Sequence, residues 1–146
     1  MGILKALIFG VLGLAVLGAA AFFVLGLVSQ GGSAPGLVEG RLSPCPDSPN
    51  CVSSEEGTAP DKATDPLASE AWDKLADTVA SQGGTITSEG EDYISAEFKS
   101  AVFGFVDDVE FRRGEDAVHI RSASRVGYSD AGANAARVAA LREALL

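Results

Sequence analysis

The sequence predicts an α+β fold with an N-terminal transmembrane helix, then an antiparallel four-stranded sheet with two helices on one face. Three observations lead to this fold class. A long uncharged stretch opens the chain, helical periodicity follows in the middle, and apolar residues then alternate with polar ones before a second helical pattern. One-sided alternation is typical of an antiparallel sheet with a single covered face. We divide the chain into an anchor (1–28), a flexible linker (29–43) and a soluble domain (44–146).

The first 28 residues predict a membrane anchor. From Ala6 to Val28 no residue is charged, and a helix of that length reaches about 35 Å, enough to cross a hydrocarbon layer of about 30 Å. A cleaved signal peptide and a buried core helix are the alternatives, although signal peptides have shorter apolar regions. Lys5 precedes the span and favours a cytoplasmic amino terminus with the domain outside. The lipid bilayer is therefore the predicted partner of residues 6–28.

The charge of the remaining chain restricts its partners. All 20 acidic residues and all but one of the 11 basic residues lie after residue 28. An acidic domain does not suit nucleic acid, whose recognition needs a basic surface. We predict no nucleic-acid partner and no cofactor, whereas an envelope protein or a small-molecule ligand is compatible with this charge.

Two cysteines follow the glycine- and proline-rich linker. Cys45 and Cys51 enclose five residues, two of them proline, and in an oxidising compartment such a pair predicts a disulfide. Reactive thiols, a zinc site and free thiols are the alternatives. A redox pair is more often spaced Cys-x-x-Cys, and zinc needs further ligands, whereas His119 is the only histidine. We therefore predict no metal.

The first helix of the domain is predicted between Asp65-Pro66 and Gly83-Gly84. Aspartate and proline suit the cap and the first turn, Ser69 is an alternative cap, and the glycine pair ends the helix. The residues at helical spacing that are predicted to pack in the core are Trp72, Leu75, Ala76 and Val79.

Four strands are then predicted, at residues 85–88, 93–99, 103–113 and 118–123. Their apolar side includes Ile94, Phe98, Val109 and Phe111, which we expect to face the helices. The last helix is predicted from Asp130, its cap, to Leu146, with an apolar stripe at Val138, Leu141 and Leu145.

The polar side of this alternation carries charges of both signs. These residues are predicted to form a solvated sheet surface with cross-strand ion pairs: Glu97, Lys99, Asp108, Glu110, Arg112, His119 and Arg121. The carboxylates of Glu97, Asp108 and Glu110 could bind a hard divalent cation, but the basic residues between them would repel it.

Asp107 breaks the alternation, because its neighbours Phe105 and Val109 are predicted to face the core. Either a bulge turns Asp107 outward, or the carboxylate is buried and needs a hydrogen-bonded cation, for which Arg125 and Arg137 are the candidates. The polar site predicted at this end of the sheet comprises Asp107, Asp108, Arg121, Ser122, Ser124, Arg125, Tyr128, Asp130, Asn134 and Arg137. We interpret it first as a network that fixes the sheet to a helix and, as the alternative, as a ligand or catalytic pocket.

Three ordered motifs resemble one known family. They are the segments 43–54 (SPCPDSPNCVSS), 105–111 (FVDDVEF) and 121–130 (RSASRVGYSD), and together residues 42–146 resemble the domain-of-unknown-function family numbered 1499. The resemblance implies a bacterial envelope protein or a chloroplast relative, often behind a membrane segment, and it implies no activity. Family members continue with Asn-Arg-x-Arg, whereas this chain reads Asn134-Ala-Ala-Arg137. A role that needs two cations on this helix is therefore not supported.

Together these features predict a single-pass protein of the bacterial inner membrane with an extracytoplasmic domain. We expect a non-catalytic binding or structural module of the cell envelope. The alternatives are a hydrolase that uses Asp107 or Asp108 near Arg125, and a thiol-redox role for Cys45 and Cys51.

Overall fold

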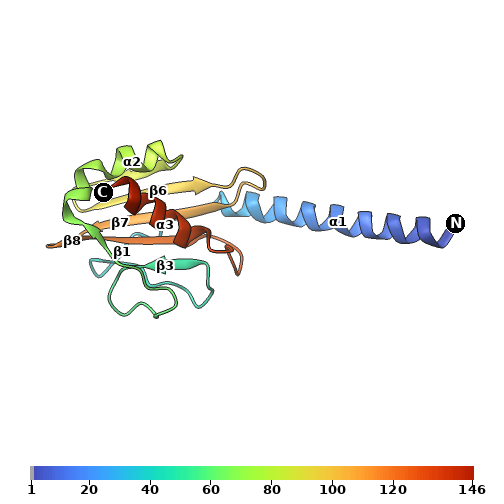
Figure 1. The fold of residues 1–146 in the computed structure, drawn as a ribbon, viewed down its shortest axis with the longest axis horizontal. Helices are drawn as coiled ribbons and strands as arrows, with labels where there is room; N and C mark the ends of the chain where they lie inside the picture. Colours follow the sequence, from blue (N-terminus) through green and yellow to red (C-terminus); the bar gives the residue numbers. More distant parts are fainter. Residues whose placement is uncertain (1) are drawn as a thin grey trace.

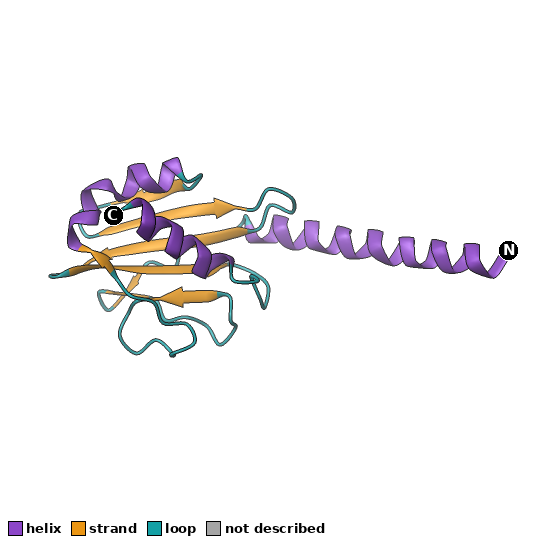
Figure 2. Ribbon diagram, viewed as in Figure 1, coloured by secondary structure: helices purple, strands orange, loops and turns teal. Residues whose placement is uncertain are grey.

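The computed structural model describes residues 2–146, in which one long helix projects from an α+β domain (Figures 1 and 2). Helix α1 spans Gly2–Ser29 and is long and apolar enough, by length and composition, to cross a membrane. Most of its side chains are exposed, and only Gly26 and Ser29, next to the domain, are buried. The uncharged stretch of the sequence is thus one uninterrupted helix.

The main sheet has six antiparallel strands, so the predicted number of four is wrong. Its order is β3-β8-β7-β6-β5, and β4 also pairs with β8. The four predicted strands are present as β5 (Thr85–Glu89), β6 (Tyr93–Lys99), β7 (Val106–Arg113) and β8 (Ala117–Ser124). The additional strands are β3 (Cys51–Ser53) and β4 (Leu67–Ala68). Strands of three and two residues are too short to show alternation, and they form because β8 offers them an edge.

Two helical segments of the domain pack on this sheet. A 3₁₀ helix, η1 (Ser69–Lys74), leads into α2 (Leu75–Ser81), and α3 spans Ala133–Ala144. The first helix begins later than Asp65-Pro66 predicts, because residues 67–68 pair with β8 instead. Helix α2 contacts β5, α3 contacts β8, and the two helices also contact each other.

One hydrophobic cluster joins helices and sheet. It contains most of the predicted core residues of both helices, and Trp72 is only 8% exposed. Leu145 is partly buried against the cluster, whereas Ala76 is not part of it. The buried members of the cluster are Leu67, Ala71, Trp72, Leu75, Val79, Ile94, Ala96, Val109, Phe111, Val118, Ile120, Val138 and Leu141. Alternate residues of β6, β7 and β8 enter this cluster, so the residues between them point to the opposite face of the sheet.

That opposite face is covered by residues 30–43, which we call the strap. Its strands β1 (Leu37–Val38) and β2 (Arg41–Leu42) form a small hairpin, and β2 contacts β7 and β8. The backbone N–H of Gly36 donates to the Glu110 carboxylate at 2.8 Å, and Leu42 is only 2% exposed. Glycine and proline content predicts a flexible linker here, but the N–H groups of Gly36 and Leu42 are bound by the carboxylates of Glu110 and Glu55.

The end of α1 is fastened to the loop between β6 and β7. A side chain at Gly26 would meet the carbonyl oxygen of Phe103 at 1.8 Å, so only glycine permits this approach. The Ser29 hydroxyl accepts a hydrogen bond from the Val106 N–H at 3.0 Å. The ring of Phe103 lies 5.3 Å from that of Phe22 and 5.2 Å from that of Phe23. Helix and domain therefore meet through a packed joint.

Candidate functional site

The structure divides the predicted polar site between the two faces of the sheet. One group lies between the sheet and α3, and we call it the helix-side cluster: Asp107, Ser122, Ser124, Asp130, Asn134 and Arg137. The other group lies under the strap, and we call it the strap-side cluster: Tyr93, Glu97, Asp108, Glu110, Arg121 and Arg125. Tyr128 belongs to neither group and is 76% exposed in the loop after β8.

Asn134 is the centre of the helix-side cluster and is completely buried. Its amide nitrogen donates to the Asn50 carbonyl at 3.1 Å and to the Ser124 hydroxyl at 3.0 Å. Its amide oxygen accepts from the Ser122 hydroxyl at 2.6 Å and from Arg137 at 2.7 Å. One side chain of α3 is thereby bonded to β8 and to the residue that precedes β3.

Asp107 faces the helices, which is the second of the two arrangements that the broken alternation left open. Its carboxylate pairs with Arg137 of α3 at 2.7 Å, and the two side chains are 13% and 15% exposed. The Arg137 guanidinium also lies 4.7 Å from the ring centre of Phe98. Of the two candidate cations, Arg137 is the partner, because Arg125 lies on the other face of the sheet.

Asp130 ties the start of α3 to this cluster. Its carboxylate accepts hydrogen bonds from the backbone N–H groups of Gly132 and Asn134 at 3.1 and 2.8 Å. Burial opposes its ionisation, but these donors outweigh burial and lower the pKa of Asp130 below its ordinary value. The carboxylate is a fixed anion at the amino-terminal end of a helix, where negative charge is favourable.

Glu110 is the centre of the strap-side cluster and is completely buried. It pairs with Arg121, its cross-strand neighbour, at 2.9 Å, and accepts a hydrogen bond from the Tyr93 hydroxyl at 2.7 Å. Burial and the Glu110 carboxylate raise the pKa of Tyr93, so its phenol stays protonated and donates. With the N–H of Gly36, three donors hold this carboxylate.

Arg125 links the sheet to the end of α1. Two of its nitrogens donate to the Asp108 carboxylate at 2.8 and 2.6 Å, and the same guanidinium pairs with Glu97. A third nitrogen donates to the carbonyl of Ser29, the last residue of α1, at 3.2 Å. The bonds to Asp108 and Glu97 raise the pKa of Arg125, which makes it a permanent cation.

The predicted solvated surface is therefore wrong for its central members. Asp108, Glu110 and Arg121 are 3%, 0% and 7% exposed, because the strap covers them. A small cavity of about 300 Å³ remains between Gly32, Pro35, Arg121 and Arg125. Within residues 2–146, the Nε atom of Arg121 is the buried side-chain nitrogen that lacks a hydrogen-bond partner.

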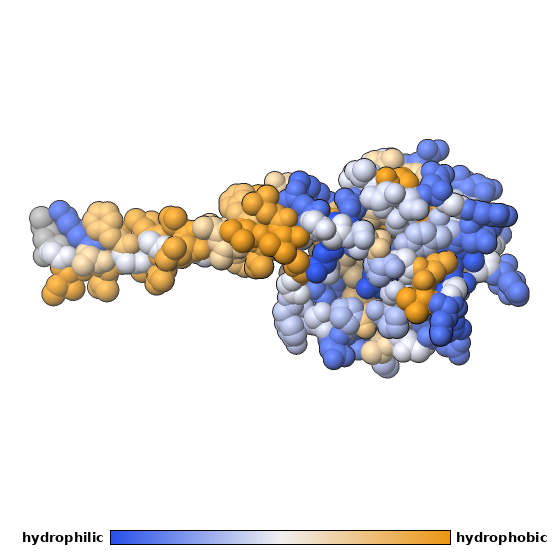
Figure 3. Space-filling model, turned by 180° about the vertical axis from the view of Figure 1, so that it is seen from behind, coloured by the Kyte–Doolittle hydropathy of each residue, from blue (hydrophilic) through white to orange (hydrophobic). Residues whose placement is uncertain are grey.

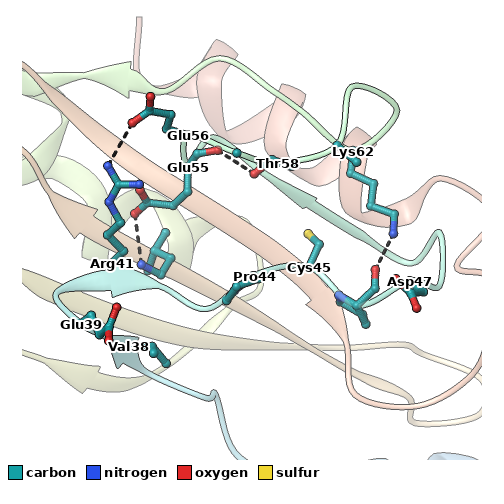
Figure 4. A pocket seen from close by; sticks show the side chains of 14 residues that line it. Val38, Glu39, Arg41, Pro44, Cys45, Asp47, Glu55, Glu56, Thr58 and Lys62 are labelled. Atoms are coloured by element: carbon teal, nitrogen blue, oxygen red, sulfur yellow. Dashed lines mark hydrogen bonds and ion pairs between the residues drawn. The ribbon is translucent and has the colours of Figure 1, made fainter.

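A larger groove lies beyond the strap hairpin, beside the disulfide (Figure 4). Its volume is about 590 Å³, which falls in the range of ligand sites. The groove lies between the strap hairpin, the Cys45 loop and the loop at residues 55–62. Its charged lining residues are Glu39, Arg41, Asp47, Glu55, Glu56 and Lys62. Acids outnumber bases, so the groove favours a cationic or neutral polar ligand over an anion.

Glu55 forms the inner wall of the groove and holds the hairpin. Its carboxylate binds Arg112 through two contacts of 2.7 and 3.1 Å and accepts the N–H of Leu42 at 3.1 Å. Burial opposes ionisation, but Arg112, Leu42 and the nearby His119 lower the pKa of Glu55 below its ordinary value of 4.5. At neutral pH the carboxylate is therefore charged and paired.

Acid is expected to loosen this contact. Because the pKa of Glu55 is lower in the folded than in the unfolded chain, its contribution is complete above the unfolded value and is lost as the pH falls through the folded value. Chemical unfolding between pH 7 and pH 3 should show this loss in the native protein. The E55Q variant should lose less stability between pH 7 and pH 3 than the native protein does. The E56Q variant, at the exposed Arg41–Glu56 pair, should lose as much as the native protein. Equal pH profiles for E55Q and the native protein would contradict the assignment.

Cys45 and Cys51 form a disulfide, as predicted, with their Cα atoms 5.7 Å apart. Cys51 is buried and begins β3, whereas the Cys45 side lines the groove. The bond therefore fastens one wall of the groove to the edge of the main sheet.

Removal of the disulfide is expected to cost about 2–2.5 kcal/mol, because the short loop gains freedom mainly in the unfolded chain. The measurement compares urea unfolding of the C45S/C51S variant with that of the oxidised native protein. Addition of reductant should lower the free energy of unfolding of the native protein to that of the variant, and it should leave the free energy of unfolding of the variant unchanged. An unchanged midpoint in the variant would show that the loop is held by its other contacts.

The sequence did not predict where four residues of these sites lie. Glu110, Glu97 and Tyr93 belong to the strap-side cluster, and Glu55 lines the groove. Cross-strand ion pairs were predicted for the polar side of these strands, and the register of β7 and β8 places Glu110 opposite Arg121. The burial of this pair was not predicted, because no periodic signal in residues 30–43 indicates that this segment covers the sheet. Within the described chain, no group of three or more histidine, cysteine, aspartate or glutamate residues is arranged to hold a metal ion.

Comparison with known proteins identifies the family. The family model described as "Protein of unknown function (DUF1499)" matches residues 41–145. The chain belongs to this family. The match covers the α+β domain with both polar clusters and most of the groove, and it leaves α1, most of the strap and the groove residues Val38 and Glu39 outside. No curated protein and no solved structure matches the DUF1499 chain significantly.

Proposed function

We propose that this DUF1499 protein is a single-pass protein of the bacterial inner membrane whose extracytoplasmic domain is a non-catalytic binding or structural module of the envelope. One observation carries the proposal: the candidate acid–base carboxylates are engaged in ion pairs. Asp107 pairs with Arg137, and Asp108 binds Arg125 through two nitrogens. A general acid or base must reach a substrate proton, and carboxylates held in this way serve the fold.

The anchoring half of the proposal is supported by α1 and by its packed joint with the domain. The test is labelling of intact cells with a membrane-impermeant thiol reagent. Cysteine at Glu115, which is exposed in the β7–β8 turn, should react without lysis, and cysteine at Gly2 should react only after lysis. The reverse pattern would place the domain in the cytoplasm and overturn this half.

The groove is the binding site that we propose for this domain. A photo-reactive amino acid at Val38, which is exposed and lines the groove, should form a defined adduct in native membranes. The same probe at Glu115 is the matched control and should form none. Equal labelling at both positions, or none at either, would contradict a binding role for the groove.

The substitution D107N separates the non-catalytic proposal from the hydrolase alternative. It removes the counter-charge of Arg137 but keeps the shape of the side chain, so a loss of about 2 kcal/mol of stability is expected. The measurements are the melting temperature and growth of cells that depend on the protein. A lower melting temperature with normal growth supports the structural role. A fully stable D107N protein that fails to support growth would favour catalysis.

A further inference from the structure

The β6–β7 loop, residues 100–105, forms an uncharged end of an otherwise acidic domain. Its sequence, Ser-Ala-Val-Phe-Gly-Phe, has no charged residue, although all 20 acidic residues of the chain lie after residue 28. Val102 at the tip is 68% exposed. A single exposed apolar residue is common on protein surfaces, so the meaning of this tip depends on what lies beside it.

The loop extends beside the apolar helix α1. Figure 1 shows the β6–β7 loop next to the domain end of the helix, and Figure 3 shows that the apolar surface of α1 widens where it meets the domain. The ring of Phe103 packs on Phe22 and Phe23 of α1, and Phe105 lies 6.1 Å from Phe22. The loop tip and the apolar helix thus form one continuous surface.

The length of α1 places this surface at the membrane boundary. A hydrocarbon core of about 30 Å takes roughly 20 helical residues. If these roughly 20 residues start after Lys5, the first charged side chain of the sequence, they end near Leu25. Phe22 and Phe23 then lie just inside the outer boundary, and Phe103, which packs on both, lies at the same depth.

A second loop lies at the same end of the domain. Ser124, the last residue of β8, pairs with Asp107 near the start of β7, so the loop after β8 is next to the β6–β7 loop. This loop carries Tyr128, which is 76% exposed. Tyrosine is enriched where membranes meet water, because its ring is apolar and its hydroxyl is polar.

We propose that the β6–β7 loop is a second membrane contact, which inserts Val102 and Phe103 into the outer interface of the bilayer beside α1. This inference rests on the proposed function, because it needs α1 to span the membrane. The packed joint at Gly26 and Ser29 holds the loop and the helix together. The domain therefore keeps one orientation on the membrane and presents its groove at a constant angle.

The test uses single tryptophans in the full-length chain, reconstituted into phosphatidylcholine nanodiscs with brominated acyl chains that quench fluorescence. The native Trp72 is replaced by phenylalanine in every variant, and each variant is checked by thermal unfolding. The probes are V102W at the loop tip, A101W beside it, L14W inside α1, and E115W in the β7–β8 turn as the distant control.

The expected result is strong quenching of L14W and V102W, with V102W quenched at least about three-fold more than E115W. Bromine near the lipid carbonyls should quench V102W more than bromine near the chain ends, and A101W should behave in the same way. Quenching of L14W with V102W and A101W at the level of E115W would overturn the loop contact and leave the anchor intact. Absence of quenching at L14W would overturn the anchor, and the loop contact with it. A V102W signal that depends on protein concentration and not on bromine would instead indicate a second copy of the chain, and would also overturn the proposal.

Discussion

Replacement of Glu110 by glutamine is expected to lower the free energy of unfolding by about 3–5 kcal/mol, because it leaves a buried guanidinium without its counter-charge. Glu110 is completely buried and Arg121 is 7% exposed, so water cannot replace the lost partner. The N–H of Gly36 also loses a charged acceptor, which weakens the hold of the sheet on the strap. Urea unfolding of the full-length protein in detergent, followed by Trp72 fluorescence, measures the effect.

The exposed pair Arg41–Glu56 is the matched control for this prediction. Its side chains are 54% and 86% exposed, and loss of such a pair costs less than about 1 kcal/mol. The double variant E110L/R121M should regain much of the stability that E110Q loses, because it removes both buried charges together. If E110Q behaves like E56Q, the strap does not exclude water from this face in solution.

Replacement of Asn134 by alanine is expected to cost about 3–4 kcal/mol, since it leaves several buried polar groups unsatisfied at about 1–3 kcal/mol each. The side chain is completely buried and binds the Asn50 carbonyl and the hydroxyls of Ser122 and Ser124. Alanine has a higher helix propensity, but its gain is below about 1 kcal/mol. Urea unfolding followed by Trp72 fluorescence measures this change in the free energy of unfolding.

The exposed Glu143 on α3 provides the control, and E143A should change stability by no more than about 0.5 kcal/mol. N134D should also be destabilising, because it places a third carboxylate beside Asp130 and Asp107. A neutral N134A variant would mean that water enters the helix-side cluster, and the network would then not fasten α3 to the sheet.

These two predictions concern clusters on opposite faces of one sheet, and each cluster joins a different set of elements. The helix-side cluster joins α3, β8 and the residue before β3. The strap-side cluster joins β6, β7 and β8 to the strap and, through Arg125, to the end of α1. Both clusters hold elements together, whereas the groove, which we propose as the binding site, lies outside them.

Much of the fold follows from local sequence signals. Strand β6 has the predicted bounds Tyr93–Lys99, because the alternation of polar and apolar residues with a period of two can be seen within a single strand. The apolar stripe of α3 at Val138 and Leu141 is buried as predicted. The two short strands β3 and β4 were not predictable, since their pairing depends on β8, which is distant in the sequence.

The candidate site was predictable in its residues but not in its arrangement. Alternation singled out Asp107, but it left open whether a bulge turns this residue outward or a cation pairs with it, and it offered two cations. Only the tertiary structure assigns Arg137 to Asp107 and Arg125 to Asp108, because the two arginines approach the sheet from opposite faces.

By itself the sequence determined the apolar helix, the four long strands, the disulfide pair and the family. Each of these depends on residues that are close together in the chain or on ordered motifs. The tertiary structure alone decided that Asp108, Glu110 and Arg121 are buried. The physical reason is that burial of a charged sheet face depends on what covers it. The cover is a glycine-rich strap about 70 residues away, whose own sequence has no periodicity that predicts packing.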